Sequence, residues 1–152
     1  MQVELNYGRG QMAVELPEDC EVTVISKPAM PVLDNPSTAM ARALANPVSA
    51  PPISELAAQA STACILICDL TRPVPNGVIL PVLIRELMAG GIAAENITVL
   101  VATGLHRPNE GEELVELIGD PWVLETVRVV NHFAREDDDH VHVGTTTKGN
   151  VV

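Results

Sequence analysis

ACILICD at residues 63–69 is followed by GVILPVLIRELMAGG at residues 77–91 and by NITVLVAT at residues 96–103. The first and last stretches are continuous apolar runs, which are typical of strands buried on both faces of a parallel sheet. The middle stretch predicts a helix that fits Pro81 only in its first turn and stops at the two glycines that follow Ala89. A strand, a helix and a strand in this order predict a right-handed crossover connection.

Elements on either side of this unit extend the same pattern. Further strands are predicted at residues 2–8, 11–17, 21–26, 125–132 and 140–146. The first two surround Gly8-Arg9-Gly10 and predict an N-terminal hairpin at the edge of the sheet. We therefore expect a single three-layer α/β domain over residues 1–152, with a mostly parallel sheet flanked by helices.

Two helices are expected before the first apolar run. Residues 35–47 predict a helix that is capped by Asn35 or Ser37 and followed by a proline. Residues 49–60 predict another, with prolines at its entry and Ser54 as the cap.

Composition limits the classes of function. The 152 residues are 47% hydrophobic and include no apolar stretch of the roughly 20 residues that a transmembrane helix needs. A net charge of −11 with only 2% aromatic residues argues against nucleic-acid binding. No signal peptide is visible at the N-terminus, so a cytoplasmic protein is expected.

The cysteines do not indicate a disulfide framework or a zinc site. Cys64 and Cys68 fall on one face of the first predicted strand, too far apart along it to bridge easily. Their spacing also differs from the usual zinc pattern. We expect buried free thiols, in agreement with a reducing compartment.

Chemistry-bearing residues lie in two loops, DLTRPVPN at residues 69–76 and TGLHRPN at residues 103–109. Each follows a predicted strand, and sites in parallel α/β sheets lie beyond the carboxyl ends of the strands. Arg72 can hold a carboxylate or phosphate with two hydrogen bonds, and His106 can take and return a proton near neutral pH. If the strands are neighbours, these side chains and Asp69 face one crevice.

A purely structural interpretation remains open for each of these residues. Asp69 can cap a turn, Arg72 can be a solvated loop cation, and a lone loop histidine is often structural. Asn109 with Glu112 resembles a capping box for a helix at residues 110–119. The residues alone therefore predict an anion-binding crevice that contains an acid/base.

DLTRPVPNG followed by LVATGLHRPNEGEEL resembles the N-terminal domain of the nickel-pincer-dependent lactate racemase family. ANPVSAPPISELA and the later VVNHFAREDDDHVHVGTTTKG fit the same pattern, so the resemblance covers most of the chain. It implies interconversion of lactate or a related 2-hydroxy acid by hydride transfer to a nickel-bearing pyridinium mononucleotide. Carried over by position, it implies His106 as an acid/base, Arg72 as the carboxylate anchor, and Asp69 in the same site.

The family's second catalytic histidine, its cofactor-bonded lysine and its nickel-binding histidine lie beyond this kind of domain. We therefore expect an N-terminal domain of a longer two-domain protein, inactive alone, whose cofactor ligands and partner domain lie outside residues 1–152. Two other interpretations stay open. One is a non-catalytic anion- or nucleotide-binding domain or partner subunit. The other is a metal-binding module of His132, His140 and His142, although the resemblance assigns these positions no metal role.

Overall fold

The computed structural model describes residues 1–152, which divide into two units, Met1–Val32 and Leu33–Val152. The first unit contains a hairpin in which β1 (Gln2–Tyr7) pairs antiparallel with β2 (Gly10–Glu15). Gly8, at the start of the turn, has a φ of 57°, a conformation that favours glycine in tight hairpins. The predicted hairpin is confirmed, but its expected place at the edge of the parallel sheet is wrong, because its two strands form a sheet of their own.

Two of the strand predictions are wrong. Residues 21–26 form neither strand nor helix, and Ile25 is 93% exposed. Residues 140–146 form only one isolated bridge, between Thr145 and Val151. Residues 21–26 pair with no neighbouring strand. In the second segment the N–H groups of Val143, Gly144 and Thr146 donate to the backbone oxygens of Val152 and Asn150, which gives a tight turn at the end of the chain and no strand of the parallel sheet.

The second unit contains a three-stranded parallel sheet in the order β3-β4-β5. Its strands are β3 (Ala63–Cys68), β4 (Ile97–Ala102) and β5 (Arg128–Asn131). The helices are α1 (Pro36–Ala45), α2 (Ile53–Ala57), α3 (Asn76–Ala89), α4 (Glu112–Ile118) and α5 (Pro121–Thr126). Short 3-10 turns occupy Ala94–Asn96 and Asp137–Asp139. The predicted α/β class, a parallel sheet flanked by helices with an N-terminal hairpin, is confirmed.

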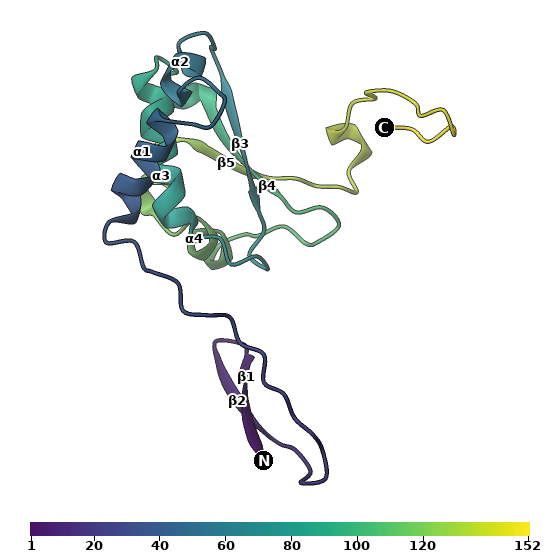
Figure 1. The fold of residues 1–152 in the computed structure, drawn as a ribbon. Coiled ribbons are helices and arrows are strands. Elements are labelled where there is room, and N and C mark those ends of the chain that lie inside the picture. Colours follow the sequence, from purple (N-terminus) through teal and green to yellow (C-terminus); the bar gives the residue numbers. More distant parts are fainter. The chain divides into compact units, whose positions relative to one another are not determined.

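The helices gather around α3, which packs against the other four. Figure 1 shows α1, α2 and α3 together on one side of the sheet. Between them and the sheet lies one hydrophobic cluster, whose fully buried members include Leu80, Ile84, Ile97, Val99 and Val101. No helix of the structure combines the length and the apolar character needed to span a membrane.

The start of α3 is fixed by its contacts with the end of α4. The buried Asn76 side chain donates a hydrogen bond from Nδ2 to the backbone oxygen of Leu117 at 3.0 Å. Gly77 lies so close to Gly119 that a Cβ atom on Gly77 would be 2.6 Å from the Gly119 oxygen. Pro81 was expected in the first turn but is the sixth helical residue, buried against the core.

The predicted helix caps have mixed outcomes. Asn35 caps α1, because its Oδ1 accepts a hydrogen bond from the Thr38 N–H at 2.9 Å. Ser54 is not a cap, since α2 begins after Pro52 and contains Ser54. The capping box is also wrong: α4 follows Gly111 and has no side-chain cap.

The outer face of β3 corrects the expectation of burial on both faces. Cys64, Leu66 and Cys68 are exposed, because the helices cover only the opposite face. All three cysteines are free, but none is buried, and Cys20 is exposed as well. The continuous apolar run therefore predicted the strand correctly, but it predicted wrongly that both faces of the strand are buried.

Candidate active site

The two motif loops lie together at one edge of the parallel sheet. β3 and β4 are hydrogen-bonded neighbours, and their last residues, Cys68 and Ala102, are register partners. The loops that begin at Asp69 and Thr103 therefore leave the sheet side by side. The predicted neighbourhood of the two strands is confirmed.

The central contact joins one loop to the other. Oδ2 of Asp69 is hydrogen-bonded to Nδ1 of His106. The Asp69 side chain is 6% exposed, whereas that of His106 is 55% exposed. An ionised carboxylate can only accept, so Nδ1 carries the proton and Nε2 of the neutral ring is left with its lone pair. The pair is thus an exposed imidazole held by a buried carboxylate.

Thr71 fixes the other oxygen of the carboxylate. Oδ1 of Asp69 accepts hydrogen bonds from the Thr71 hydroxyl at 2.6 Å and from the Thr71 backbone N–H at 3.2 Å. The Thr71 hydroxyl, followed by the His106 ring, holds the pKa of the Asp69 carboxyl below its ordinary value. Asp69 is therefore ionised near neutral pH and stabilises positive charge on the imidazole.

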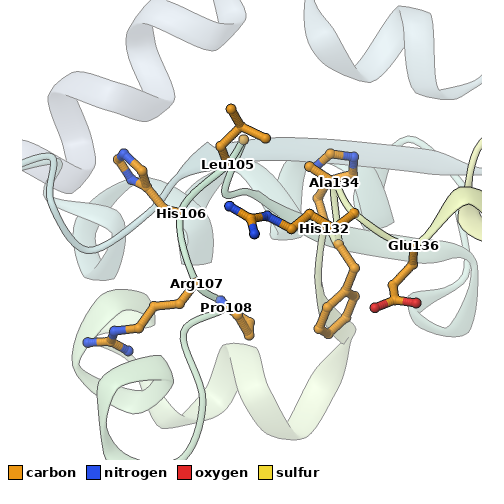
Figure 2. Close-up of a pocket in the computed structure, with 10 residues that line it drawn as sticks. Leu105, His106, Arg107, Pro108, His132, Ala134 and Glu136 are labelled. Atoms are coloured by element: carbon orange, nitrogen blue, oxygen red, sulfur yellow. The ribbon is translucent and has the colours of Figure 1, made fainter.

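His106 and Arg107 line two adjacent pockets. The smaller, of about 160 Å³, also includes Asp69, Thr71 and Asn109. The larger, of about 420 Å³, continues toward residues 132–136. Figure 2 shows the larger pocket, with His106 at the left of the view and Glu136 at the right. A small molecule can therefore reach the imidazole from either pocket.

The two arginines near the site differ in their partners. Arg107 donates two hydrogen bonds to Glu113, at 2.5 and 2.6 Å. This pair raises the pKa of Arg107 and lowers that of Glu113. Arg72 is exposed, makes no ion pair, and does not line either pocket. Of the two, only the Arg72 guanidinium remains available to an anion.

Asn109 braces the site, a role that the sequence did not indicate. Its Oδ1 accepts a hydrogen bond from the Leu70 backbone N–H at 3.1 Å, which ties the second loop to the first. Asn131, the last residue of β5, holds the Asn109 backbone through two hydrogen bonds of 2.8 and 2.9 Å. Asn131 ends β5, and this position at the carboxyl end of a parallel strand was the signal that the sequence offered for the asparagine pair.

Thr103 anchors the second loop to the segment that follows β5. Its buried hydroxyl donates a hydrogen bond to the His132 backbone oxygen at 2.6 Å. Together with the asparagine brace, this bond connects the chain after β3, β4 and β5 into one hydrogen-bonded rim. The loop that carries His106 is part of that rim.

The three C-terminal histidines do not form a common cluster. Nε2 of His132 and Nε2 of His140 are 3.2 Å apart, whereas His142 contacts Thr145. Nδ1 of His140 donates to the Glu136 backbone oxygen at 2.8 Å. No group of three or more His, Cys, Asp or Glu side chains that could hold a metal ion occurs in the structure. The predicted three-histidine module is therefore not assembled.

Comparisons with known proteins identify the family of this chain. The family model described as lactate racemase N-terminal domain matches residues 7–152. The lactate racemase of Lactiplantibacillus plantarum is 36% identical over 108 residues, which are 71% of this chain and 25% of that protein. The lactate racemase of Thermoanaerobacterium thermosaccharolyticum is 30% identical over 149 residues, which are 97% of this chain and 34% of that protein.

A solved structure extends the similarity to the fold. The lactate racemase apoprotein of Thermoanaerobacterium thermosaccharolyticum superposes with a TM-score of 0.74 at 28% identity, covering 99% of this chain and 34% of that one. The chain thus spans between a quarter and about a third of the length of these relatives. It belongs to the lactate racemase N-terminal domain family.

Proposed function

We propose that this chain is the N-terminal domain of a lactate-racemase-like enzyme that interconverts the stereoisomers of a 2-hydroxy acid. The hydrogen-bonded pair of Asp69 and His106, which joins the two motif loops, is the observation that carries the proposal. An acid/base that is oriented by a buried carboxylate is the arrangement that proton transfer to and from a substrate requires. Family membership supports lactate or a close relative as the substrate.

His106 handles the proton of the substrate hydroxyl in this proposal. Loss of hydride from C2 turns the hydroxyl carbon into a carbonyl, so the hydroxyl proton must leave as well. Nε2 of His106 accepts that proton, and Asp69 stabilises the imidazolium that results. When hydride returns to C2, Nε2 gives the proton back to the oxygen.

Arg72 binds the substrate carboxylate in this proposal. Its guanidinium is exposed and makes no ion pair, whereas that of Arg107 is already committed to Glu113. Arg72 also lies three residues after Asp69 on the same loop, and its backbone N–H donates to the backbone oxygen of Asp69 at 3.1 Å. A guanidinium and a carboxylate pair through two parallel hydrogen bonds, which would fix the orientation of C2.

The proposed enzyme uses a nickel-pincer pyridinium mononucleotide, which when bound supplies the hydride acceptor. The donor set of this chain does not fit a nickel site, because no group of three or more potential ligands is assembled in it. We therefore assign the nickel ligands and the covalent attachment to the polypeptide beyond the matched domain. This chain alone is expected to show no racemase activity.

Steady-state kinetics of the full-length protein with D- and L-lactate tests the assignment of Arg72, with Arg107 as the matched control. Arg72→Lys keeps the charge but loses the planar pair of donors, so we expect KM to rise roughly 10- to 100-fold, which corresponds to one charged hydrogen bond. Arg107→Lys should change KM by less than about threefold, because the Arg107 guanidinium is already paired with Glu113 and lysine keeps its charge. An unchanged KM for Arg72→Lys would contradict the carboxylate assignment.

A further inference from the structure

Two of the three C-terminal histidines meet through their ring nitrogens. Nε2 of His132 and Nε2 of His140 are 3.2 Å apart, whereas the ring centroids are 5.3 Å apart and the ring planes lie at 87°. The two rings therefore approach through their nitrogen edges and do not stack. Two nitrogens bound to one tetrahedral ion at about 2.0–2.1 Å are roughly 3.3–3.4 Å from each other. The separation of the two histidine nitrogens is thus close to that of two ligands of one metal ion.

A hydrogen bond on the far side of the His140 ring prepares it for a metal ion. Nδ1 of His140 donates to the backbone oxygen of Glu136 at 2.8 Å, so in the neutral ring Nε2 carries the lone pair. Histidine ligands of metal ions almost always donate their other ring N–H to a carbonyl or carboxylate oxygen in this way. Without a metal ion, Nε2 of His132 donates its proton to this lone pair. Transfer of that proton to Nδ1 of His132 would leave both Nε2 atoms free to bind one ion.

The charge around the pair favours a cation. Four consecutive acidic residues, 136–139, lie in the segment that joins the two histidines, and all four are exposed. The only basic residue in the same segment is Arg135, so the segment carries four negative charges against one positive charge. The ligand type selects among cations, because imidazole suits zinc, copper and nickel, whereas magnesium and calcium take oxygen ligands.

We propose that His132 and His140 chelate one divalent transition-metal ion of the zinc and copper class. The chain supplies only these two ligands, since no group of three or more potential ligands is assembled in it. Water would fill the other coordination positions, as it does at open zinc sites. The site is therefore an exchangeable one, separate from the nickel ligands that the proposed function assigns to the polypeptide beyond this domain. The inference does not depend on racemase activity.

A metal ion at this pair would stiffen the wall of the larger pocket. His132 and Glu136 line that pocket together with His106 (Figure 2). The backbone oxygen of His132 also accepts the hydrogen bond from the Thr103 hydroxyl, at the start of the loop that carries His106. A metal ion shared by His132 and His140 would close residues 132–140 into a short loop attached to this rim. Metal occupancy would therefore hold the pocket-lining residues 133–136 in one conformation.

Histidine side-chain NMR of the 152-residue chain, titrated with Zn²⁺ after alkylation of its three exposed cysteines, tests the site residue by residue. The Nε2 resonances of His132 and His140 should shift together with a stoichiometry of one ion per chain, while those of His142 stay in place. Mg²⁺ is the control for the acidic segment and should shift neither ring. A shift of only one ring of the pair, a shift of neither, or equal shifts with Mg²⁺ would overturn the proposal.

Calorimetry of Zn²⁺ binding to two variants of the alkylated chain provides a second readout. His140 lies on an exposed loop, and His140→Ala should lower the affinity for Zn²⁺ by at least the 10- to 100-fold that loss of a ligand's outer partner typically costs, that is by about tenfold or more. His142→Ala is the matched control, because it removes an exposed imidazole two residues away that contacts Thr145 instead. Its affinity should stay that of the unsubstituted chain. An unchanged affinity in His140→Ala, or an equal loss in both variants, would overturn the assignment of the pair.

Discussion

Replacing Asn109 by alanine separates the brace seen in the structure from the helix cap that the sequence indicated. Asn109 is 5% exposed, and its Oδ1 accepts the hydrogen bond from the Leu70 backbone N–H. Alanine leaves this partly buried N–H without a partner, which costs about 1–3 kcal/mol of unfolding free energy. For a domain of this size the melting temperature should fall by roughly 3–5 °C for each kcal/mol.

Glu112 is the matched control for this prediction. A capping box would need the Glu112 carboxylate as much as Asn109, whereas in the structure α4 has no side-chain cap. Glu112→Ala should therefore change the unfolding free energy by less than about 0.5 kcal/mol. Thermal and urea unfolding of the two variants, followed by circular dichroism, measures the difference. Equal losses of 1 kcal/mol or more in both, about the value of a helix cap, would refute the brace.

Two further outcomes follow from the packing and the charges. Gly77→Ala should lower the unfolding free energy by about 1–3 kcal/mol through overpacking against the loop after α4, whereas Gly144→Ala, which adds its Cβ to open space, should cost little; urea unfolding measures both. The pKa of the Asp69 carboxyl, measured by carbon NMR, should lie below its ordinary value, and Thr71→Val should move this pKa upward. Because that pKa is lowered on folding, the stabilisation is present above about pH 4 and is lost as the pH falls through the folded pKa.

The sequence was most informative where a local pattern sufficed. The helix at residues 36–45, its Asn35 cap, the N-terminal hairpin and the three core strands follow from periodicity and turn residues. The order of strand and helix also placed Asp69 and His106 at one edge of the sheet. Right-handed crossover connections make consecutive strands parallel, so the loops that follow these strands leave the sheet at the same edge.

The features that the sequence did not predict depend on contacts between residues that are far apart in the chain. Residues 21–26 carry a strand pattern, but no neighbouring strand pairs with them. Asn109 carries a capping pattern, but its side chain accepts from Leu70, 39 residues away. The exposure of Leu66 depends on which face the connections cross, and an apolar run does not contain that information. Arg72 was expected to converge on the imidazole, and its exposed side chain does not line the pockets.

The turnover of His106→Ala in the full-length protein, measured with D- and L-lactate at saturating concentration, tests the acid/base assignment most directly. The His106 side chain is 55% exposed and its ring is held by Asp69, so removal of the imidazole should lower kcat by about 10²- to 10⁴-fold. The equilibrium between the two stereoisomers must stay the same, because a catalyst does not change it. A kcat within about threefold of the unsubstituted protein would contradict the assignment and leave the pair of Asp69 and His106 a structural contact.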